Sequence, residues 1–235
     1  MNSTTLDIIV PCYNPIKGWE KELYTNFTLL KKQLTNINLS LTLINDGSET
    51  GINTETISYL ESNVTNFNYL KYAINKGKGY ALRKGVARSN AEFIIFTDVD
   101  FPYQIESIVK VFEELQKGTD AAIGNRDIDY YEKTPFIRAL ISKTFKSFIK
   151  LFLQLKVTDT QCGLKGFNKT GKNEFLSTTI NRFLFDLEFV KKCSQNKNIS
   201  IKAVPVLLKD NVVFSKMDYK ILARESVNFL MILLK

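Results

Sequence analysis

The stretch FIIFTDVD, residues 93–100, decides how the rest of the chain is interpreted. Its first four residues are apolar, and a run this short is typical of a buried strand rather than of a core helix. Asp98 and Asp100 follow at once, at the strand end where open α/β sheets bind ligands. Paired acids in that place suit a hard divalent cation. A plainer interpretation is that Asp98 caps a turn and Asp100 is merely exposed, because the pattern D-x-D is frequent by chance.

Strand and helix patterns alternate along the chain on both sides of this stretch. Further strands are predicted at residues 6–10, 39–44, 68–73, 120–123 and 199–206, with a short strand at the end of residues 157–167. Helices are predicted at residues 20–34, 52–64, 81–89, 105–116 and 183–193. This alternation favours one α/β domain with a Rossmann-like, mostly parallel central sheet flanked by helices. The strand at residues 199–206 is expected near a sheet edge, because Pro205 cannot donate to the ladder.

Polar turns follow two other strands of this predicted sheet. Pro11-Cys12-Tyr13-Asn14 ends the first strand at its proline, and Asn45-Asp46-Gly47-Ser48 ends the second. The carboxyl ends of parallel strands lie on one edge, so these turns should meet the two acids there. Asp46 can accept a hydrogen bond from a base N–H, and Gly47 lets a backbone pass close by. Taken alone, the second motif fits a plain turn as well as it fits a binding loop.

Two basic features are expected at the same edge. Residues 75–79, NKGKG, precede a predicted helix whose N-terminus could hold a phosphate. They are not a Walker A loop, and the first strand lacks the glycines of a dinucleotide fingerprint. Arg126 follows the strand at residues 120–123, where a guanidinium can bind a phosphate in bidentate fashion.

Composition restricts the chemistry further. The 235 residues contain no histidine, which excludes imidazole bases and histidine metal ligands. The three cysteines have no paired spacing. The formal charge of +8 fits polyanionic partners, either nucleotide phosphates, nucleic acid or an anionic membrane surface. We expect no signal peptide and no transmembrane span, since no apolar run reaches about 18 residues.

Two segments are candidates for membrane contact. Residues 136–156 place phenylalanine, leucine and isoleucine on one helical arc and lysines on the other. This pattern fits a core helix with solvated lysines, or an interfacial helix on a lipid surface. Residues 219–234 predict a final apolar-rich helix. Because the basic residues gather between phenylalanines near residues 138–156, a nucleic-acid-binding function is disfavoured.

In combination, these motifs resemble those of the family 2 inverting glycosyltransferases with a GT-A-type fold. The resemblance is carried by IVPCYN at 9–14, NDGS at 45–48, NKGKG at 75–79 and DVD at 98–100. The segments DTQCGLK at 159–165 and FDLE at 185–188 are most similar to the polyprenyl-phosphate sugar transferases, within them to the dolichyl-phosphate glucosyltransferase branch.

The resemblance implies a metal-dependent, inverting transfer of a sugar from a UDP-sugar to a polyprenyl phosphate, and glucose is the sugar that it favours. Dolichyl or undecaprenyl phosphate would be the acceptor, with the protein cytoplasmic and peripheral on the cytosolic membrane face. Residues 1–126 would bind the nucleotide sugar and residues 127–216 the acceptor, with a C-terminal helix at 217–235. Membrane contact would use residues 136–156, with residues 219–235 as a second candidate, and no nucleic acid would be bound. The alternatives are a saccharide hydroxyl as acceptor, GDP-mannose as donor, or a nucleotidyltransferase.

The resemblance also implies roles for individual residues. Donor binding is expected from Pro11, Tyr13, Asn14, Asp46, Gly47, Lys76, Lys78 and Asp98. Mg²⁺ or Mn²⁺ is expected on Asp100, with Asp98 beside it. The implied catalytic residues are Asp98, Asp100, Arg126 and Asp159. Acceptor binding is expected from Arg126, Arg138, Gln161, Lys165, Asp186 and Glu188.

Two departures from the family pattern bear on the donor and the metal. Asn45 replaces one of the usual paired aspartates, and Pro102 stands where the mannosyl branch often has a metal-binding glutamine. The acceptor decides whether a base is needed. A lipid phosphate is already an anionic nucleophile, whereas a hydroxyl would need a carboxylate base, for which Asp159, Asp186 and Glu188 are the candidates.

Overall fold

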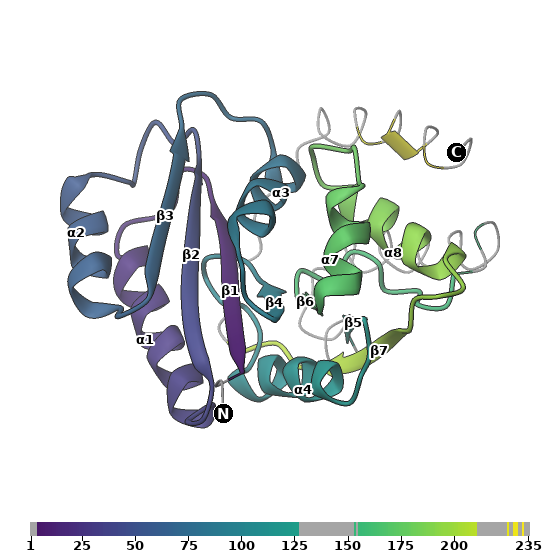
Figure 1. The fold of residues 1–235 in the computed structure, drawn as a ribbon. Coiled ribbons are helices and arrows are strands. Elements are labelled where there is room, and N and C mark those ends of the chain that lie inside the picture. Colours follow the sequence, from purple (N-terminus) through teal and green to yellow (C-terminus); the bar gives the residue numbers. More distant parts are fainter. Residues whose placement is uncertain are drawn as a thin grey trace.

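A computed structural model describes residues 4–126, 153, 155–210, 225, 228, 229 and 232. Its centre is a seven-stranded sheet in the order β3-β2-β1-β4-β6-β5-β7 (Figure 1). The strands are β1 (Thr5–Cys12), β2 (Asn38–Asp46), β3 (Phe67–Tyr72), β4 (Phe93–Phe96), β5 (Ala121–Arg126), β6 (Lys165–Phe167) and β7 (Ile201–Val206). The helices are α1 (Trp19–Gln33), α2 (Thr54–Asn63), α3 (Lys78–Arg88), α4 (Ile105–Gln116), α7 (Lys169–Leu176) and α8 (Phe185–Gln195).

The mostly parallel sheet predicted from the sequence is confirmed. Strand β6 alone among the described strands runs antiparallel to its neighbours, β4 and β5. Strand β7 pairs only with β5 and forms an edge, as Pro205 predicted. The short strand β6 was predicted, but its reversal was not, because so short a strand carries no sequence signal of its direction. Helix α7 was also missed.

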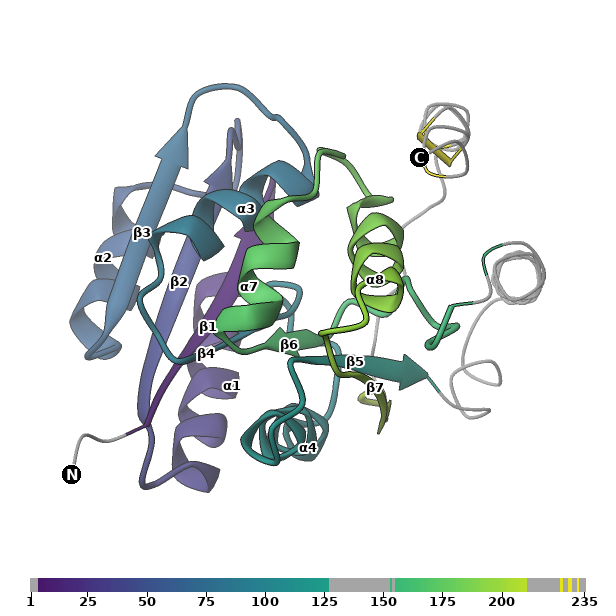
Figure 2. The same ribbon diagram turned by 45° about the vertical axis from the view of Figure 1, so that its right-hand side comes forward.

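Helices cover both faces of the sheet (Figure 2). Alternate residues of a strand point to opposite faces, so Ile8 packs with α1, α2 and α4, whereas Ile9 packs with α3, α7 and α8. Phe96, the last residue of β4, faces the second layer. Its ring lies 5.5 Å from Phe175 of α7 and 5.9 Å from Phe185 of α8, between ring centroids. Such aromatic pairs contribute about 0.5–1.5 kcal/mol each beyond burial, so the strand end is anchored directly below the two acids.

Several element boundaries differ from the sequence prediction, and three of them bear on the site. Strand β1 does not stop at Pro11 but continues to Cys12, because β4 pairs only with residues 6–9 and leaves Pro11 beside β2 alone. Helix α3 begins at Lys78, three residues before the predicted start, and α8 begins at Phe185. The early start of α3 places Lys78 on the first turn of the helix.

The predicted amphipathic helix at residues 136–156, including Arg138, lies almost wholly outside the described residues. The same holds for most of the predicted C-terminal helix. Four of its residues are described. Ile232 is buried, and Phe229 packs against the hydrophobic cluster that contains the buried residues of α8. In the part of the chain that the structure describes, no helix is long and apolar enough to cross a membrane.

Close packing of α3 on the sheet depends on Gly85. A Cβ atom at this position would lie 2.7 Å from Ile44 Cδ1 and 2.9 Å from Ile9 Cγ2. We expect Gly85→Ala to lower the free energy of unfolding by about 1–3 kcal/mol through overpacking, although alanine has the better helix propensity by about 1 kcal/mol. Urea denaturation measures the change. The exposed neighbour substitution Lys84→Ala should stay within about 0.5 kcal/mol, and a Gly85→Ala protein as stable as wild type would contradict this account.

Candidate active site

The turns after β1 and β2 are joined by hydrogen bonds at the carboxyl edge of the sheet. The Asn14 backbone N–H donates to Ser48 Oγ at 3.0 Å, and Asn14 Oδ1 accepts from Glu49 N at 2.8 Å. Asn14 has a left-handed backbone, with φ of 45°, which asparagine tolerates better than most residues. The convergence of strand ends predicted from the sequence is therefore present. Tyr13 beside it is half exposed at this edge.

Asp46 organises the loop that leads into α3. Its Oδ1 accepts from the Tyr72 hydroxyl at 2.7 Å and from Lys76 N at 2.8 Å. Its Oδ2 accepts from Asn75 Nδ2 and Gly77 N, both at 2.9 Å. A carboxylate has about four lone-pair sites, so these four donors fill them, and the side chain is only 3% exposed. A base N–H, the partner predicted for Asp46, would have to replace one of these donors.

Gly47 and Asn45 serve the same loop. A Cβ atom on Gly47 would lie 2.4 Å from Asn75 N, and its φ is 69°, so glycine is required here. The backbone that passes close to Gly47 is thus the chain's own. Asn45 Oδ1 accepts from Ser48 N at 2.8 Å and its amide donates to Tyr69 Oη at 3.1 Å. The amide that replaces a family aspartate closes this turn.

Lys78 and Asp98 form an ion pair at the centre of the edge. Lys78 Nζ lies 2.5 Å from Asp98 Oδ1, with side-chain exposures of 18% and 40%. Burial acts to lower the pKa of Lys78, but Asp98 and then Asp186 outweigh it and raise the pKa. The second lysine of the motif, Lys76, instead lies over the ring of Tyr80, 4.8 Å from the centroid.

The turn that carries the two acids is held rigidly. Phe101 N donates to the Asp98 carbonyl at 3.0 Å, and Phe101 has a φ of 46° while its side chain is fully buried. A left-handed phenylalanine is unusual and costs about 1–3 kcal/mol, so core packing must hold it. Asp100 is exposed, and its pKa is raised by desolvation and then by the charge of Asp98. The turn therefore directs one acid toward Lys78 and leaves the other open to solvent.

The segment before β6 forms the other wall beside Asp98. A Cβ atom on Gly163 would lie 2.7 Å from Asp98 Oδ2. The Tyr103 hydroxyl accepts from Gly163 N at 3.0 Å and from Cys162 Sγ at 3.3 Å, which ties this segment to the turn after the acids. Sequence analysis did not single out Tyr103 or Gly163 for the site. Only a glycine at position 163 lets the backbone approach the carboxylate so closely.

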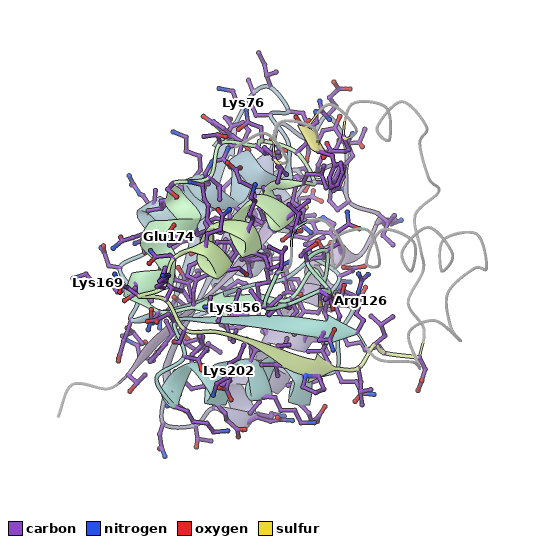
Figure 3. All side chains as sticks on the ribbon, turned by 90° about the vertical axis from the view of Figure 1, so that its right-hand side faces the viewer. Lys76, Arg126, Lys156, Lys169, Glu174 and Lys202 are labelled. Atoms are coloured by element: carbon purple, nitrogen blue, oxygen red, sulfur yellow. The ribbon has the colours of Figure 1, made fainter. Side chains whose placement is uncertain are left out.

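Two predicted catalytic residues, Arg126 and Asp159, form a bidentate ion pair. Arg126 Nη2 lies 2.6 Å from Asp159 Oδ1, and both Nε and the backbone N–H donate to Oδ2, at 2.9 and 2.8 Å. Asp159 is 1% exposed. Burial opposes the charge of Arg126, but Asp159 raises its pKa well above the ordinary value. Figure 3 shows Arg126 on the right of the molecule, apart from Lys76 at the top.

The predicted acceptor residues that the structure describes are mostly enclosed. Lys165 is fully buried, with Nζ 2.6 Å from Asp186 Oδ1 and a hydrogen bond to the Cys162 carbonyl. Glu188 accepts from Thr179 N and Oγ1 and from Ile180 N, at 2.8–2.9 Å. Gln161 is exposed. Lys165, Asp186 and Glu188 thus build the framework of this side of the site, while Arg138 lies outside the described residues.

The acids after β4 can hold a divalent cation together with a bound phosphate. Asp98 and Asp100 supply hard oxygen donors, and no group of three acidic or cysteine side chains in the described ranges would enclose a metal alone. Mg²⁺ commonly takes one or two carboxylates and fills its remaining positions with substrate phosphates and water. This donor set fits such a shared site, with Asp100 the more open ligand.

Comparisons with known proteins define the family. Residues 7–174 match the profile of glycosyl transferase family 2. The dolichyl-phosphate beta-glucosyltransferase of Dictyostelium discoideum is 29% identical over 215 residues, and the match spans 86% of this chain and 65% of that relative. The chain thus spans less than two thirds of the relative's length.

Solved structures show the same fold. A mannosyltransferase of Pyrobaculum calidifontis, in complex with GDP-Man and Mn²⁺, superposes with a TM-score of 0.51, at 14% identity over 85% of this chain and 57% of its own. The 4-diphosphocytidyl-2C-methyl-D-erythritol synthase of Anaerococcus prevotii superposes with a TM-score of 0.54, at 14% identity over 96% and 97%. Because the identity to both enzymes is only 14%, the structural similarity establishes the fold alone.

The sequence profile covers most of the chain, and the chain belongs to glycosyl transferase family 2. Both the resemblance and the GT-A-type α/β fold predicted from the sequence are confirmed. The family match also disfavours the nucleotidyltransferase alternative, which the fold alone would allow.

Asp46 should matter for local order before α3. We expect Asp46→Ala to leave the Lys76 and Gly77 amides without an acceptor and to lower the free energy of unfolding by about 1–3 kcal/mol. Hydrogen exchange should accelerate at these two amides in particular. Glu49→Ala removes an exposed acid from the adjacent turn and is the matched control. Unchanged exchange at both amides in Asp46→Ala would contradict the role assigned to this carboxylate.

Proposed function

We propose that this protein transfers glucose from UDP-glucose to a polyprenyl phosphate, with inversion at the anomeric carbon and with Mg²⁺ or Mn²⁺. The reaction would take place at the cytosolic face of a membrane. The observation that carries the proposal is the acidic turn after β4, with Asp98 paired to Lys78 and Asp100 open, in a chain of this family. The name of the Dictyostelium relative supports the choice of sugar and acceptor.

The donor side of the proposal uses the loops at the carboxyl edge. Pro11, Tyr13 and Asn14 would lie on one side of the nucleotide, and the loop held by Asp46 would present Lys76 and Lys78 to it. A diphosphate bound between Lys78 and the two acids could contact both the Lys78 ammonium and a metal held by the acids. When bound, the metal offsets the charge that develops on the leaving diphosphate. Asp100 would be its main ligand, and Asp98 would share the metal and also contact the sugar or ribose.

The acceptor side favours an anionic nucleophile. Each of the three carboxylates proposed as bases already accepts hydrogen bonds within the chain, Asp159 from Arg126, Asp186 from Lys165, and Glu188 from the residues before α8. A hydroxyl acceptor would have to displace one of these partners to lose its proton, whereas a phosphate needs no such base. In-line attack of a phosphate oxygen on C1 would break the C1–O bond and invert the configuration.

The membrane side of the proposal rests on the two amphipathic segments. Residues 136–156 would lie on the lipid surface with phenylalanines inserted and lysines near anionic headgroups. Described residues of the C-terminal segment contact α8 instead, because Glu225 Oε2 accepts from Leu184 N at 2.9 Å and Lys191 Nζ donates to the Ile232 carbonyl at 2.5 Å. The C-terminal segment would therefore offer only its other side to lipid.

Direct assay tests the reaction. Purified protein is incubated with Mn²⁺, labelled UDP-glucose and either dolichyl phosphate, undecaprenyl phosphate or free oligosaccharides, and label is counted in the organic phase. We expect transfer to a polyprenyl phosphate, with GDP-mannose a poorer donor. Label found only in oligosaccharides would instead establish the saccharide-hydroxyl alternative.

Asp100 should be essential in that assay. Asp100→Asn keeps the size of an exposed side chain and removes its charge, so we expect a loss of kcat of about 100-fold or more, in the range of lost electrostatic stabilisation, with an unchanged melting temperature. Excess EDTA should abolish wild-type transfer, and added Mn²⁺ should restore it. Glu61→Gln, an equivalent change on the exposed side of α2, serves as the control. Normal activity in Asp100→Asn would refute the metal site.

A further inference from the structure

Four charged side chains of alternating sign link the two halves of the site. Asp98 pairs with Lys78 at 2.5 Å, and Lys165 pairs with Asp186 at 2.6 Å. The two pairs also act on each other, since Asp186 is the second acid that stabilises the charge of Lys78. The charges of these four residues balance. Asp100, next to them on the β4 turn, adds a further negative charge, on which Lys78 also acts.

Among the lysines that the structure describes near this turn, only Lys78 is placed to compete with a cation for Asp98. Lys165 is fully buried and held by both Asp186 and the Cys162 carbonyl. Lys76 lies over Tyr80, and Lys209 Nζ donates to Asn26 Oδ1 at 2.6 Å. Lys78 is the one whose ammonium contacts the carboxylate that a metal would share.

We infer that Lys78 is a built-in counterion that keeps a divalent cation from binding to Asp98 until the diphosphate of the donor is present. This inference rests on the metal-dependent transfer proposed above. A doubly charged ion beside Asp98 would face the ammonium group at close range, which is repulsive while both depend on the same carboxylate. A diphosphate supplies separate anionic oxygens for both cations, so that metal and donor bind together.

The helix that carries Lys78 is fixed, so the exchange requires only movement of the side chain. The amide of Gly77, the residue before the helix, donates to Asp46, and Tyr80 N donates to the Asn181 carbonyl at 3.1 Å. Further along α3, Arg83 Nη1 donates to the Ile180 carbonyl at 2.7 Å. The Lys78 ammonium can turn from Asp98 toward a diphosphate, with Asp186 still nearby to stabilise its charge.

The test is Mn²⁺ binding, followed by electron paramagnetic resonance of free Mn²⁺, without any acceptor. Wild-type protein should bind Mn²⁺ alone weakly, and UDP should strengthen the binding. Lys78→Met should bind Mn²⁺ alone about tenfold more tightly than wild type or better, because the competing cation is gone. The same variant should bind UDP more weakly, since the diphosphate loses a partner. These two changes have opposite signs, which a merely damaged site would not produce.

Two further variants are controls. Lys84→Met removes the same charge from an exposed position of α3 and should bind Mn²⁺ like wild type. Lys78→Arg retains the positive charge and should also bind Mn²⁺ alone weakly, and circular dichroism verifies folding of each variant. Equal Mn²⁺ affinity in wild type and Lys78→Met would overturn the inference, as would wild-type binding of Mn²⁺ that UDP does not strengthen.

Failure of this inference can be told apart from failure of the proposed function. Mn²⁺ binding needs no lipid and no transfer, so a protein inactive toward polyprenyl phosphate can still show the Lys78 effect. Conversely, transfer that requires Mn²⁺, with no change of Mn²⁺ affinity in Lys78→Met, would uphold the function and remove the counterion role.

Discussion

Four hydrogen bonds to one buried carboxylate, Asp46, set the geometry on which the site depends. They pull the loop after β3 against the end of β2, where Gly47 leaves room for its backbone. Two of the donors are main-chain amides immediately before α3, so the position of the helix follows from the position of the carboxylate. Lys78 is the first residue of that helix, and its ammonium contacts Asp98 on the turn after β4. The buried Asp46 carboxylate at the end of β2 thus places the Lys78 ammonium beside the turn that follows β4.

Much of this arrangement could be predicted from the sequence, because it depends on strand order. An apolar run ended by polar residues identifies a strand end, and parallel strands bring their ends together whatever the details of packing. Hence the segments around Asn14, Asp46 and Asp98 were expected to meet, and they do. Tyr72 could have been added by the same argument, since it ends β3.

The partners of these residues could not be predicted, because they are set by tertiary distances of a few ångströms. Asp46 looked like a ligand for a base, yet its acceptors are filled by its own chain. Lys165 was expected to bind the acceptor, but in the antiparallel strand β6 it is fully buried and paired with Asp186. The left-handed Phe101 has no sequence signal either, since the side chain that holds it in place is an ordinary core residue.

The two acids after β4 therefore lie in different environments, although the D-x-D pattern alone does not distinguish them. Asp98 lies between an ammonium group and the close backbone of Gly163, so its charge is compensated and its position is fixed. Asp100 is exposed, and the charge of its neighbour opposes its own ionisation. In the proposed reaction, a divalent cation would gain most from Asp100, because Lys78 already pairs with Asp98. The restrained acid would then orient the donor and the open acid would be the main metal ligand, and the helix that Asp46 holds in place sets this difference.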